Sequence, residues 1–299
     1  MFTTWTLRYN QLRWLRIDGL EQHWERANVD AVIGGEDVDV TIETKNVSAL
    51  TLRFEPGACP IEAAAKPKVR IDDEDVEDVP PVMSDRSWTA HFRKKGKTWE
   101  AVARVDDGVL RKKHGLQGPI DDAFMDSFLM VRPTGKALND KVGDWVTGEM
   151  KHALDHWRKQ FRGEARVKDD SDVSEEDIAA HHLVLWGDPA SNKVLARIAD
   201  KLPVRWDARE VRLGEEKFSA EDHVPVLVYP NPLNPKRYVV LNSGFTFREY
   251  DYLNNARQVP KLPDYSVIDV TVPPSSRWPG KVVAAGFFNE EWKLPEKEQ

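Results

Sequence analysis

Residues 183 to 206, LVLWGDPASNKVLARIADKLPVRW, constrain the fold of this chain more than any other stretch. An apolar run ends at Gly187, a short polar loop follows, and an amphipathic segment leads into a second apolar run. This order is typical of a buried strand, a loop, a helix and the next strand of a parallel sheet. Ligands bind at the carboxyl ends of parallel strands in open α/β folds, so the loop is either a ligand site or a helix cap.

The rest of the second half repeats this alternation of apolar strands and helical segments. We expect a long helix over residues 140–161 and shorter helices near 190–200 and 246–257, between strand candidates. Alternating strands and helices predict a mostly parallel sheet with helices on both faces. Residues 116–299 should therefore form a flavodoxin-like α/β domain of three layers.

The first part of the chain has a different periodicity, in which every second residue is apolar. VDVTIET at 38–44 and ALTLRF at 49–54 show it, and two further runs between residues 87 and 105 repeat it around a glycine-containing turn. Such alternation is typical of strands with one buried face. Several short strands without a long helix predict an all-β, immunoglobulin-like sandwich over residues 1–115, although the single Cys59 cannot supply the usual disulfide.

Length and charge argue against several classes of protein. The chain has 299 residues, 40% hydrophobic and 31% charged, which is typical of folded globular proteins and long enough for two domains. Its net charge of -7 is unlike that of a nucleic-acid-binding surface. No apolar run approaches the ~20 residues that span a bilayer, and the first residues lack the pattern of a signal peptide. We therefore expect neither a nucleic acid nor a membrane as partner.

Small polar residues follow several of the expected strands. If these loops meet at one edge of the sheet, their side chains can orient a polar small molecule or a polymer. Each residue taken alone is also typical of a turn or a helix cap. The candidate ligand-binding residues are Thr134, Asp188, Ser191, Asn192, Asn231, Asn242 and Ser243.

No catalytic motif accompanies these residues, and we assign no catalytic residue. Serine hydrolases of the α/β type place the nucleophile in G-x-S-x-G, which is absent, and the last histidine, His223, precedes Ser243. A triad in the order serine, acid, histidine therefore cannot be completed around Ser243. P-loop and G-x-G-x-x-G patterns are absent as well, so we expect no cofactor.

Glu149, His152 and His156 are the best candidates for metal ligands, because residues at this spacing share one flank of a helix. The H-E-x-x-H motif is absent, and no further ligand motif is evident. We therefore expect a solvated helix flank at these residues and no metal site.

Six segments together carry a resemblance to a known family. They are TLRYNQLRWLRIDGLEQHWERANVDAVI, TKNVSALTL, GLQGPIDDAFMDSFLMVRPTG, LVLWGDPASNKVLARIADKLPVRW, YPNPLNPKRYVVLNSGFTFREY and KLPDYSVIDV. In this order they resemble the C-terminal part of large bacterial α/β-hydrolase-fold proteins, described as prolyl-oligopeptidase-like or polyhydroxybutyrate-depolymerase-like esterases. The resemblance covers nearly the whole chain but includes no catalytic motif. It implies a serine hydrolase domain upstream of this region, and export to the periplasm or the cell exterior.

The resemblance and the sequence together predict a non-catalytic accessory or substrate-binding region. We expect it to pack on the upstream hydrolase domain through its N-terminal segment. Trp5, Tyr9 and Trp14 crowd the first fifteen residues, where a free terminus is usually polar.

Two alternatives stay open. The chain could be an independent enzyme or small-molecule binder that uses the strand-end pocket, with Asp188 as acid or base. It could also be an adhesion module that binds polysaccharide through Trp88 or Trp99, although the alternation of apolar residues predicts that both face the core.

Overall fold

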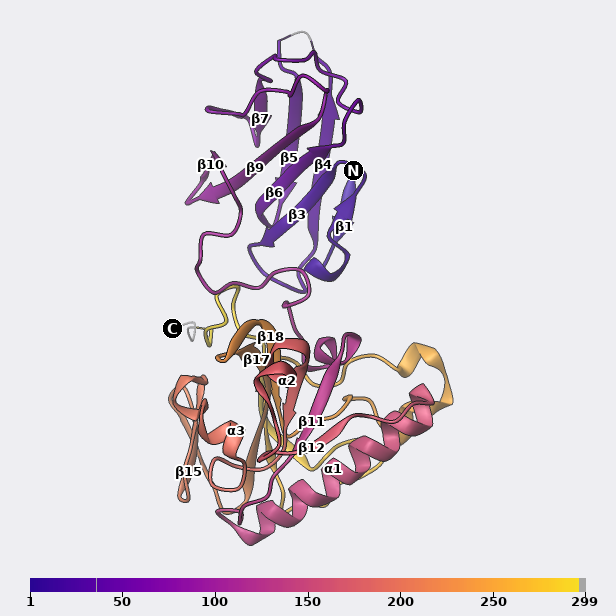
Figure 1. Cartoon of the computed structure of the whole chain (residues 1–299), viewed down its shortest axis with the longest axis vertical. Helices are drawn as coiled ribbons and strands as arrows, with labels where there is room; N and C mark the ends of the chain where they lie inside the picture. Colours follow the sequence, from indigo (N-terminus) through magenta and orange to yellow (C-terminus); the bar gives the residue numbers. More distant parts are fainter. Residues whose placement is uncertain (36, 296–299) are drawn as a thin grey trace. The chain divides into compact units, whose positions relative to one another are not determined.

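The computed structural model describes residues 1–35 and 37–295, which form two compact units (Figure 1). Unit 1 consists of Met1–Gln117 and of a returning segment, Asn289–Trp292. Unit 2 consists of Gly118–Phe288 and of the described residues from Lys293 onward. No helix in the described part of the chain is long and apolar enough to cross a membrane.

Unit 1 contains two sheets of five strands each. The strands of the first sheet, in spatial order, are β1 (Phe2–Thr4), β4 (Ala27–Ile33), β5 (Val40–Lys45), β7 (Val69–Ile71) and β8 (Glu74–Val76). Those of the second sheet are β10 (Thr98–Val102), β9 (Trp88–Lys95), β6 (Val47–Phe54), β3 (Leu15–Leu20) and β2 (Gln11–Leu12). Neighbouring strands are antiparallel except for β5 and β7, and the short 3-10 helix η1 (Leu7–Tyr9) precedes β2.

Both sheets of unit 1 bury side chains in one shared core. The period of two in the sequence places Val40 and Ile42 of β5, and Leu50 and Leu52 of β6, at 0% exposure. Alternate side chains of a strand point to the same face, so each strand contributes a row of apolar residues to this core.

Trp88 and Trp99 belong to the same core, with 1% and 5% of their surface exposed. Each indole N–H has a partner, since Trp88 Nε1 donates to Pro80 O at 2.9 Å and Trp99 Nε1 donates to Asp72 Oδ2 at 2.9 Å. Buried tryptophans with a satisfied N–H are typical core residues. Their ring faces are not available to a polysaccharide, so the adhesion hypothesis loses its basis.

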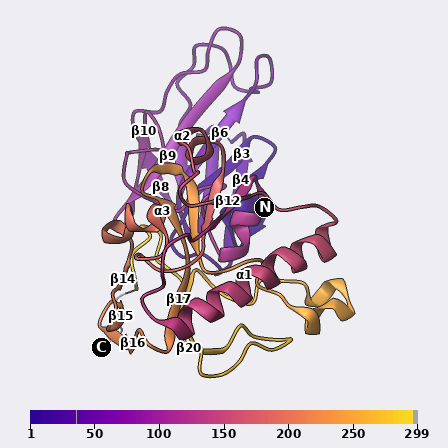
Figure 2. The same cartoon turned by 60° about the horizontal axis from the view of Figure 1, so that its bottom comes forward.

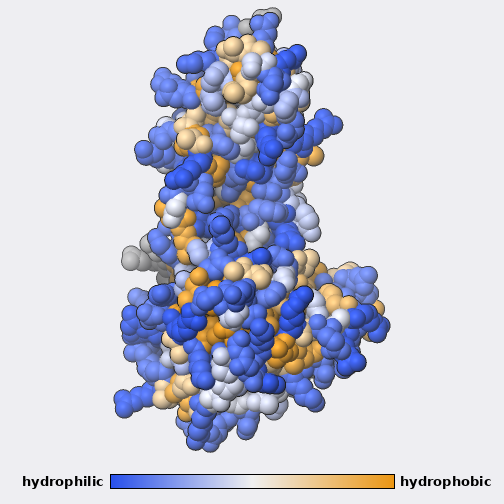
Figure 3. Space-filling view, in the orientation of Figure 1, coloured by the Kyte–Doolittle hydropathy of each residue, from blue (hydrophilic) through white to orange (hydrophobic). Residues whose placement is uncertain are grey.

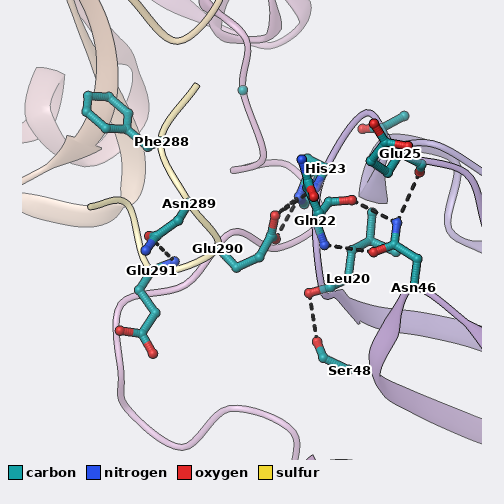
Figure 4. A network of polar contacts seen from close by, with 12 residues as sticks. Leu20, Gln22, His23, Glu25, Asn46, Ser48, Phe288, Asn289, Glu290 and Glu291 are labelled. Atoms are coloured by element: carbon teal, nitrogen blue, oxygen red, sulfur yellow. Dashed lines mark hydrogen bonds and ion pairs between the residues drawn. The ribbon is translucent and has the colours of Figure 1, made fainter. Parts of the chain in front are cut away.

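The loop between β3 and β4 is fixed from two sides by side-chain hydrogen bonds (Figure 4). On one side, Glu290 of the returning segment accepts from His23 N–H at 2.8 Å, and its Oε2 lies 2.7 Å from His23 Nδ1. Lys112 N–H donates to Glu290 O at 2.8 Å, which holds the backbone of the same segment. On the other side, Asn46 Oδ1 accepts from Gln22 N–H and Asn46 Nδ2 donates to Gln22 O, both at 2.8 Å.

Unit 2 is built around a mixed sheet of seven strands. Its strands, in spatial order, are β12 (Val167–Asp169), β11 (Phe128–Arg132), β13 (His182–Leu185), β18 (Asn234–Leu241), β17 (His223–Asn231), β19 (Tyr265–Asp269) and β20 (Lys281–Gly286). The first four run parallel to one another, whereas β17 is antiparallel to both neighbours and β20 is antiparallel to β19. A separate sheet of three strands holds β14 (Val204–Trp206), β15 (Glu210–Leu213) and β16 (Glu216–Ser219).

The two faces of the seven-stranded sheet are covered differently (Figure 1, Figure 2). One face shares a core with α2 (Glu175–Ala180), α3 (Lys193–Ala196) and the three-stranded sheet, through residues such as Ile178 and Leu195. The long helix α1 (Asp140–Phe161) lies along the other face. Its buried apolar residues are Val142, Trp145, Val146, Met150 and Ala153.

The prediction of a flavodoxin-like α/β domain with a mostly parallel sheet is wrong. The structure is mostly β and the large sheet is mixed, because β17 and β18 form a hairpin. β17 ends at Asn231 and β18 begins at Asn234, whereas a parallel connection needs roughly a dozen residues or more. The strand predicted to follow the 183–206 helix in the parallel sheet, β14, instead pairs antiparallel with β15 in the separate sheet.

The expected helical layers are also smaller than predicted. The segment 190–200 contains the four-residue α3 and the start of the 3-10 helix η3 (Ala199–Lys201). The segment 246–257 contains two short 3-10 helices, η4 (Glu249–Leu253) and η5 (Asn255–Arg257). A further 3-10 helix, η2 (Ile120–Met125), precedes β11. One face of the sheet therefore has the long helix α1 with the short η4 against it, and the other face has α2, α3 and the three-stranded sheet.

Removing the Glu290 carboxylate should destabilise unit 1. Glu290→Ala leaves the N–H and the ring of His23, which is 6% exposed, without their acceptor, at a cost of about 1–3 kcal/mol. Glu291→Ala is the control. Glu291 lies 3.2 Å from Arg111, and the two side chains are 36% and 35% exposed, so their ion pair should contribute less than about 1 kcal/mol to the free energy of unfolding. Urea unfolding followed by tryptophan fluorescence measures both variants. An equal loss of unfolding free energy in the two variants would contradict a special role of the contact between Glu290 and His23.

Candidate functional site

Three parallel strands of unit 2 end at the same edge of the large sheet. The loops that follow β11, β13 and β18 carry all of the candidate ligand-binding residues except Asn231. Hydrogen bonds join these loops, since Gly135 N–H donates to Ser191 O at 2.9 Å and Gly187 N–H donates to Asn242 Oδ1 at 2.8 Å. The sequence left open whether its four candidate loops meet at one edge, and the structure brings these three of them together.

Asn231 lies at the opposite edge of the sheet. It ends β17, which is antiparallel to β18, and it pairs with Asn234 across the hairpin. Asn231 is 0% exposed, and its Oδ1 accepts from Leu233 N–H at 2.9 Å. Its side chain shapes the hairpin turn and does not join the other candidates.

Asp188 and Ser191 use their polar atoms to hold the loop after β13. Asp188 Oδ1 accepts from Ala190 N–H and Ser191 N–H, both at 2.9 Å, and Asp188 Oδ2 accepts from Leu138 N–H at 2.8 Å. Ser191 Oγ in turn accepts from Asp188 N–H at 2.9 Å. Asp188 is 0% exposed and Ser191 is 3% exposed. These side chains satisfy backbone N–H groups that would otherwise be buried without a partner.

Asn192 and Asn242 also bind the backbone. Asn192 Oδ1 caps α3 by accepting from Val194 N–H at 3.0 Å, and its Nδ2 donates to Trp186 O at 2.9 Å. Asn242 Nδ2 donates to Gly187 O at 3.0 Å, so the amide binds both the N–H and the carbonyl of this glycine. Asn242 adopts φ +51°, a conformation that asparagine tolerates better than most residues. Both amides therefore fix loop geometry.

A small hollow of about 20 Å³, room for about one water molecule, lies beside this edge, between α1 and the segment that follows β18. Of the candidates, Asn242 and Ser243 line it, whereas Thr134 is an exposed loop residue elsewhere on the edge. Ser243 is 8% exposed, and its Oγ donates to Gly244 O at 2.9 Å. A Cβ at Gly244 would lie 2.6 Å from the Cβ of Ala153, so the segment needs glycine to approach α1 this closely.

A buried ion pair that sequence reasoning missed forms part of the wall of the hollow. Arg248 Nη1 donates to Glu149 Oε2 at 2.7 Å, and Arg248 Nη2 donates to Glu149 Oε1 at 3.2 Å. The side chains are 7% and 9% exposed, and Arg248 Nε donates to Ser275 O at 2.9 Å. Bidentate pairs of this kind fix geometry, because either charge left alone at this depth would be costly.

The three candidate metal ligands on α1 have three different partners. Glu149 pairs with the arginine described above, His152 Nε2 lies 2.8 Å from Glu249 Oε1, and His156 Nδ1 lies 2.6 Å from Tyr252 Oη. Burial lowers the pKa of His156 to about 4. The prediction of a solvated flank is wrong for Glu149 and His156, which are 7% and 2% exposed. In the described residues, no group of three His, Cys, Asp or Glu is placed to hold a metal ion.

Asp121 lies behind the hollow and was also missed by sequence reasoning. Thr246, which lines the hollow, donates its N–H to Asp121 Oδ1 at 2.7 Å. Asp121 is 3% exposed, and burial raises its pKa to about 7, with a further increase from the negative charge of Asp122. The only sequence signal is a pair of acidic residues inside the apolar segment IDDAF. At neutral pH this carboxyl is therefore partly protonated.

A scan against protein-family models, a search of curated proteins and a search of solved structures each found no match. The chemistry of the edge must therefore be argued from its geometry. The side chains that shape its loops form hydrogen bonds with backbone groups, and most of its ionisable side chains contact a partner of opposite charge or a hydrogen-bonding side chain. Ser243, Thr246 and His152 are among the polar residues that line the hollow.

Asp121 should make the protein lose stability as pH rises. The pKa is about 7 in the folded protein against an ordinary value of 3.8, so between these values the folded state keeps a proton that the unfolded chain releases. The free energy of unfolding of the wild type, compared with that of Asp121→Asn, should fall by about 1.4 kcal/mol for each unit that the pH rises across this window.

Urea unfolding of both proteins at several pH values between about 4 and 7 measures this difference. Asp126→Asn is the control, because Asp126 is exposed and a hydrogen bond from Ser127 lowers its pKa, so its effect should be flat across the window. A difference between wild type and Asp121→Asn that does not change with pH would contradict a protonated carboxyl.

Proposed function

We propose that this chain is a non-catalytic accessory module that binds the α/β-hydrolase domain implied by the sequence resemblance. The observation that carries the proposal is a set of exposed apolar side chains within the first 24 residues of unit 1. The set consists of Trp5, Tyr9, Leu12 and Trp24, whose exposed fractions are 50%, 74%, 46% and 36%. We call it the N-terminal apolar surface.

Trp24 is held on this surface in an unusual backbone conformation. Its φ is +69°, in the left-handed region that a bulky residue rarely adopts and that costs on the order of 1 kcal/mol. Trp24 N–H donates to Trp5 O at 2.9 Å, and the preceding residue, His23, is fixed by Glu290. Neighbouring contacts thus overcome local strain and place an exposed tryptophan beside a second one. Strain of this kind is concentrated at functional positions.

Exposed tryptophan and tyrosine side chains favour a protein partner for this surface. Apolar side chains reach the surface of the molecule among a mostly hydrophilic exterior (Figure 3). Clusters of large exposed apolar residues mark interaction sites, and aromatic residues dominate the energy of protein interfaces. An upstream hydrolase domain packed on the N-terminal apolar surface would bury these rings.

The strand-end edge of unit 2 supports a non-catalytic role. Asp188, which would be the acid or base of an independent enzyme, binds three backbone N–H groups. Ser243 donates to a backbone carbonyl, and no histidine in the described residues is hydrogen-bonded to it. The hollow beside Ser243 has room for about one water molecule, far less than a small-molecule pocket needs, so it does not favour the alternative of an independent small-molecule binder.

A photo-crosslinking amino acid in place of Trp5 should form a crosslink to an α/β-hydrolase domain, either within the same polypeptide or in a separate protein. The full chain is produced in its native cells, irradiated and purified, and the crosslinked domain is identified by mass spectrometry. The same amino acid in place of Met83, which is 59% exposed on unit 1, should not form that crosslink. Identical products from both positions, or no product carrying a hydrolase domain, would contradict the proposal.

A fluorophosphonate serine-hydrolase probe should not label the isolated chain, and a panel of activated esters should not be hydrolysed. The physical reason is that Ser243 Oγ has a backbone carbonyl, and not a general base, as hydrogen-bond acceptor. Circular dichroism shows that the assayed protein is folded. Labelling that maps to Ser243, together with turnover abolished by Ser243→Ala, would overturn the non-catalytic assignment.

A further inference from the structure

A second exposed surface, on unit 2, combines two arginines with two aromatic side chains. The guanidinium carbon of Arg277 lies 3.7 Å from the centroid of the Tyr250 ring, and that of Arg257 lies 5.0 Å from the same centroid. Trp278 follows Arg277 and is 43% exposed, and Tyr250 is 38% exposed. We call these four residues the arginine–tyrosine platform.

Among the described residues, no ion pair neutralises the positive charge of this platform. In the described part of the chain, neither Arg257 nor Arg277 forms an ion pair with a carboxylate. The two neighbouring acidic residues of η4 are engaged elsewhere: Glu249 lies 2.8 Å from His152, and Asp251 lies 3.2 Å from Lys261. The platform is therefore a local basic site on a protein whose net charge is -7.

Hydrogen bonds hold the platform in place before any partner binds. The turn that carries Arg277 and Trp278 is closed by Ser275 N–H, which donates to Trp278 O at 2.8 Å. Tyr250 N–H donates to Ser276 O at 3.0 Å, which ties η4 to this turn. The buried Arg248 also donates to Ser275 O. A surface ordered in this way loses little conformational entropy when it binds a partner.

We propose that the arginine–tyrosine platform binds an extended acidic segment of a partner protein, with carboxylates on alternate residues. Each guanidinium can donate two parallel N–H bonds to one carboxylate, and stacking on Tyr250 leaves the N–H edges available. Both guanidinium carbons lie near one ring centroid, so they cannot be more than about 9 Å apart. Alternate side chains of an extended chain point the same way at a spacing of about 6.6 Å, which fits this limit.

The composition of the platform favours a protein segment over other anions. Arginine, tyrosine and tryptophan are the residues that contribute most to protein interfaces. A nucleic acid would require a wider basic surface, because its affinity depends on neutralising many phosphates. This site is on a different unit from the N-terminal apolar surface, so the inference does not depend on the proposed function.

The test is the binding of a fluorescein-labelled peptide of alternating glutamate and serine to the full chain, measured by fluorescence anisotropy at about 0.15 M salt. Arg257→Gln and Arg277→Gln should each weaken binding roughly 3- to 10-fold. Arg277→Lys should restore only part of the affinity, because an ammonium group cannot form the bidentate pair. Arg205→Gln, at an exposed arginine of β14, is the matched control and should leave the affinity unchanged.

Four outcomes would overturn the inference. The first is equal binding of a peptide in which glutamine replaces glutamate, and the second is an equal loss in Arg205→Gln. The third is tighter binding of polygalacturonate than of the peptide with the same sensitivity to Arg257→Gln, which would assign the site to an acidic polysaccharide. Absence of binding by folded wild-type protein would overturn it as well, with circular dichroism as the check on folding.

Discussion

The buried ion pair between Glu149 and Arg248 determines how three segments of unit 2 meet. Glu149 lies on α1, Arg248 lies in the segment after β18, and the Arg248 Nε–H holds the turn at Ser275. Either charge alone would be costly at this depth, so the three segments are stable only in the arrangement that brings the charges together. The hollow beside α1 and the turn that carries Arg277 both follow from this contact.

The strand-end edge shows a competition between two uses of the same polar atoms. Loops that leave the carboxyl ends of parallel strands carry backbone N–H groups that no ladder satisfies. In this protein the loops supply their own acceptors, since Asp188 and Asn192 bind these N–H groups at distances of 2.8 to 3.0 Å. An atom engaged in this way offers little to a ligand. A sequence rich in Asp, Asn and Ser at strand ends can therefore indicate rigid loops as readily as a binding pocket.

The sequence predicted the local elements of residues 183–206 better than the partners of those elements. Residues 183–206 do contain a strand, a short helix and a second strand, because these depend on nearby residues. The second strand nevertheless pairs with β15 in another sheet, since Asp207 Oδ1 accepts from Arg209 and Glu210 N–H and stabilises a tight antiparallel turn. The sequence grouped Asn231 with the wrong edge of the sheet for the same reason, because β17 forms a short antiparallel hairpin with β18. The pairing of Glu149 with Arg248 joins distant parts of the chain, and no local pattern reports it.

The charge of the whole protein bears on how an acidic partner would reach the arginine–tyrosine platform. A net charge of -7 repels an acidic segment at long range when little salt is present, because the Debye length is then about 30 Å. At about 0.15 M salt this length falls to about 8 Å, so distant carboxylates are screened while Arg257 and Arg277 still act on a bound carboxylate. Much higher salt would also weaken these direct contacts. Affinity should thus be greatest at intermediate salt, unlike that of a broad polybasic surface, which declines steadily as salt is added.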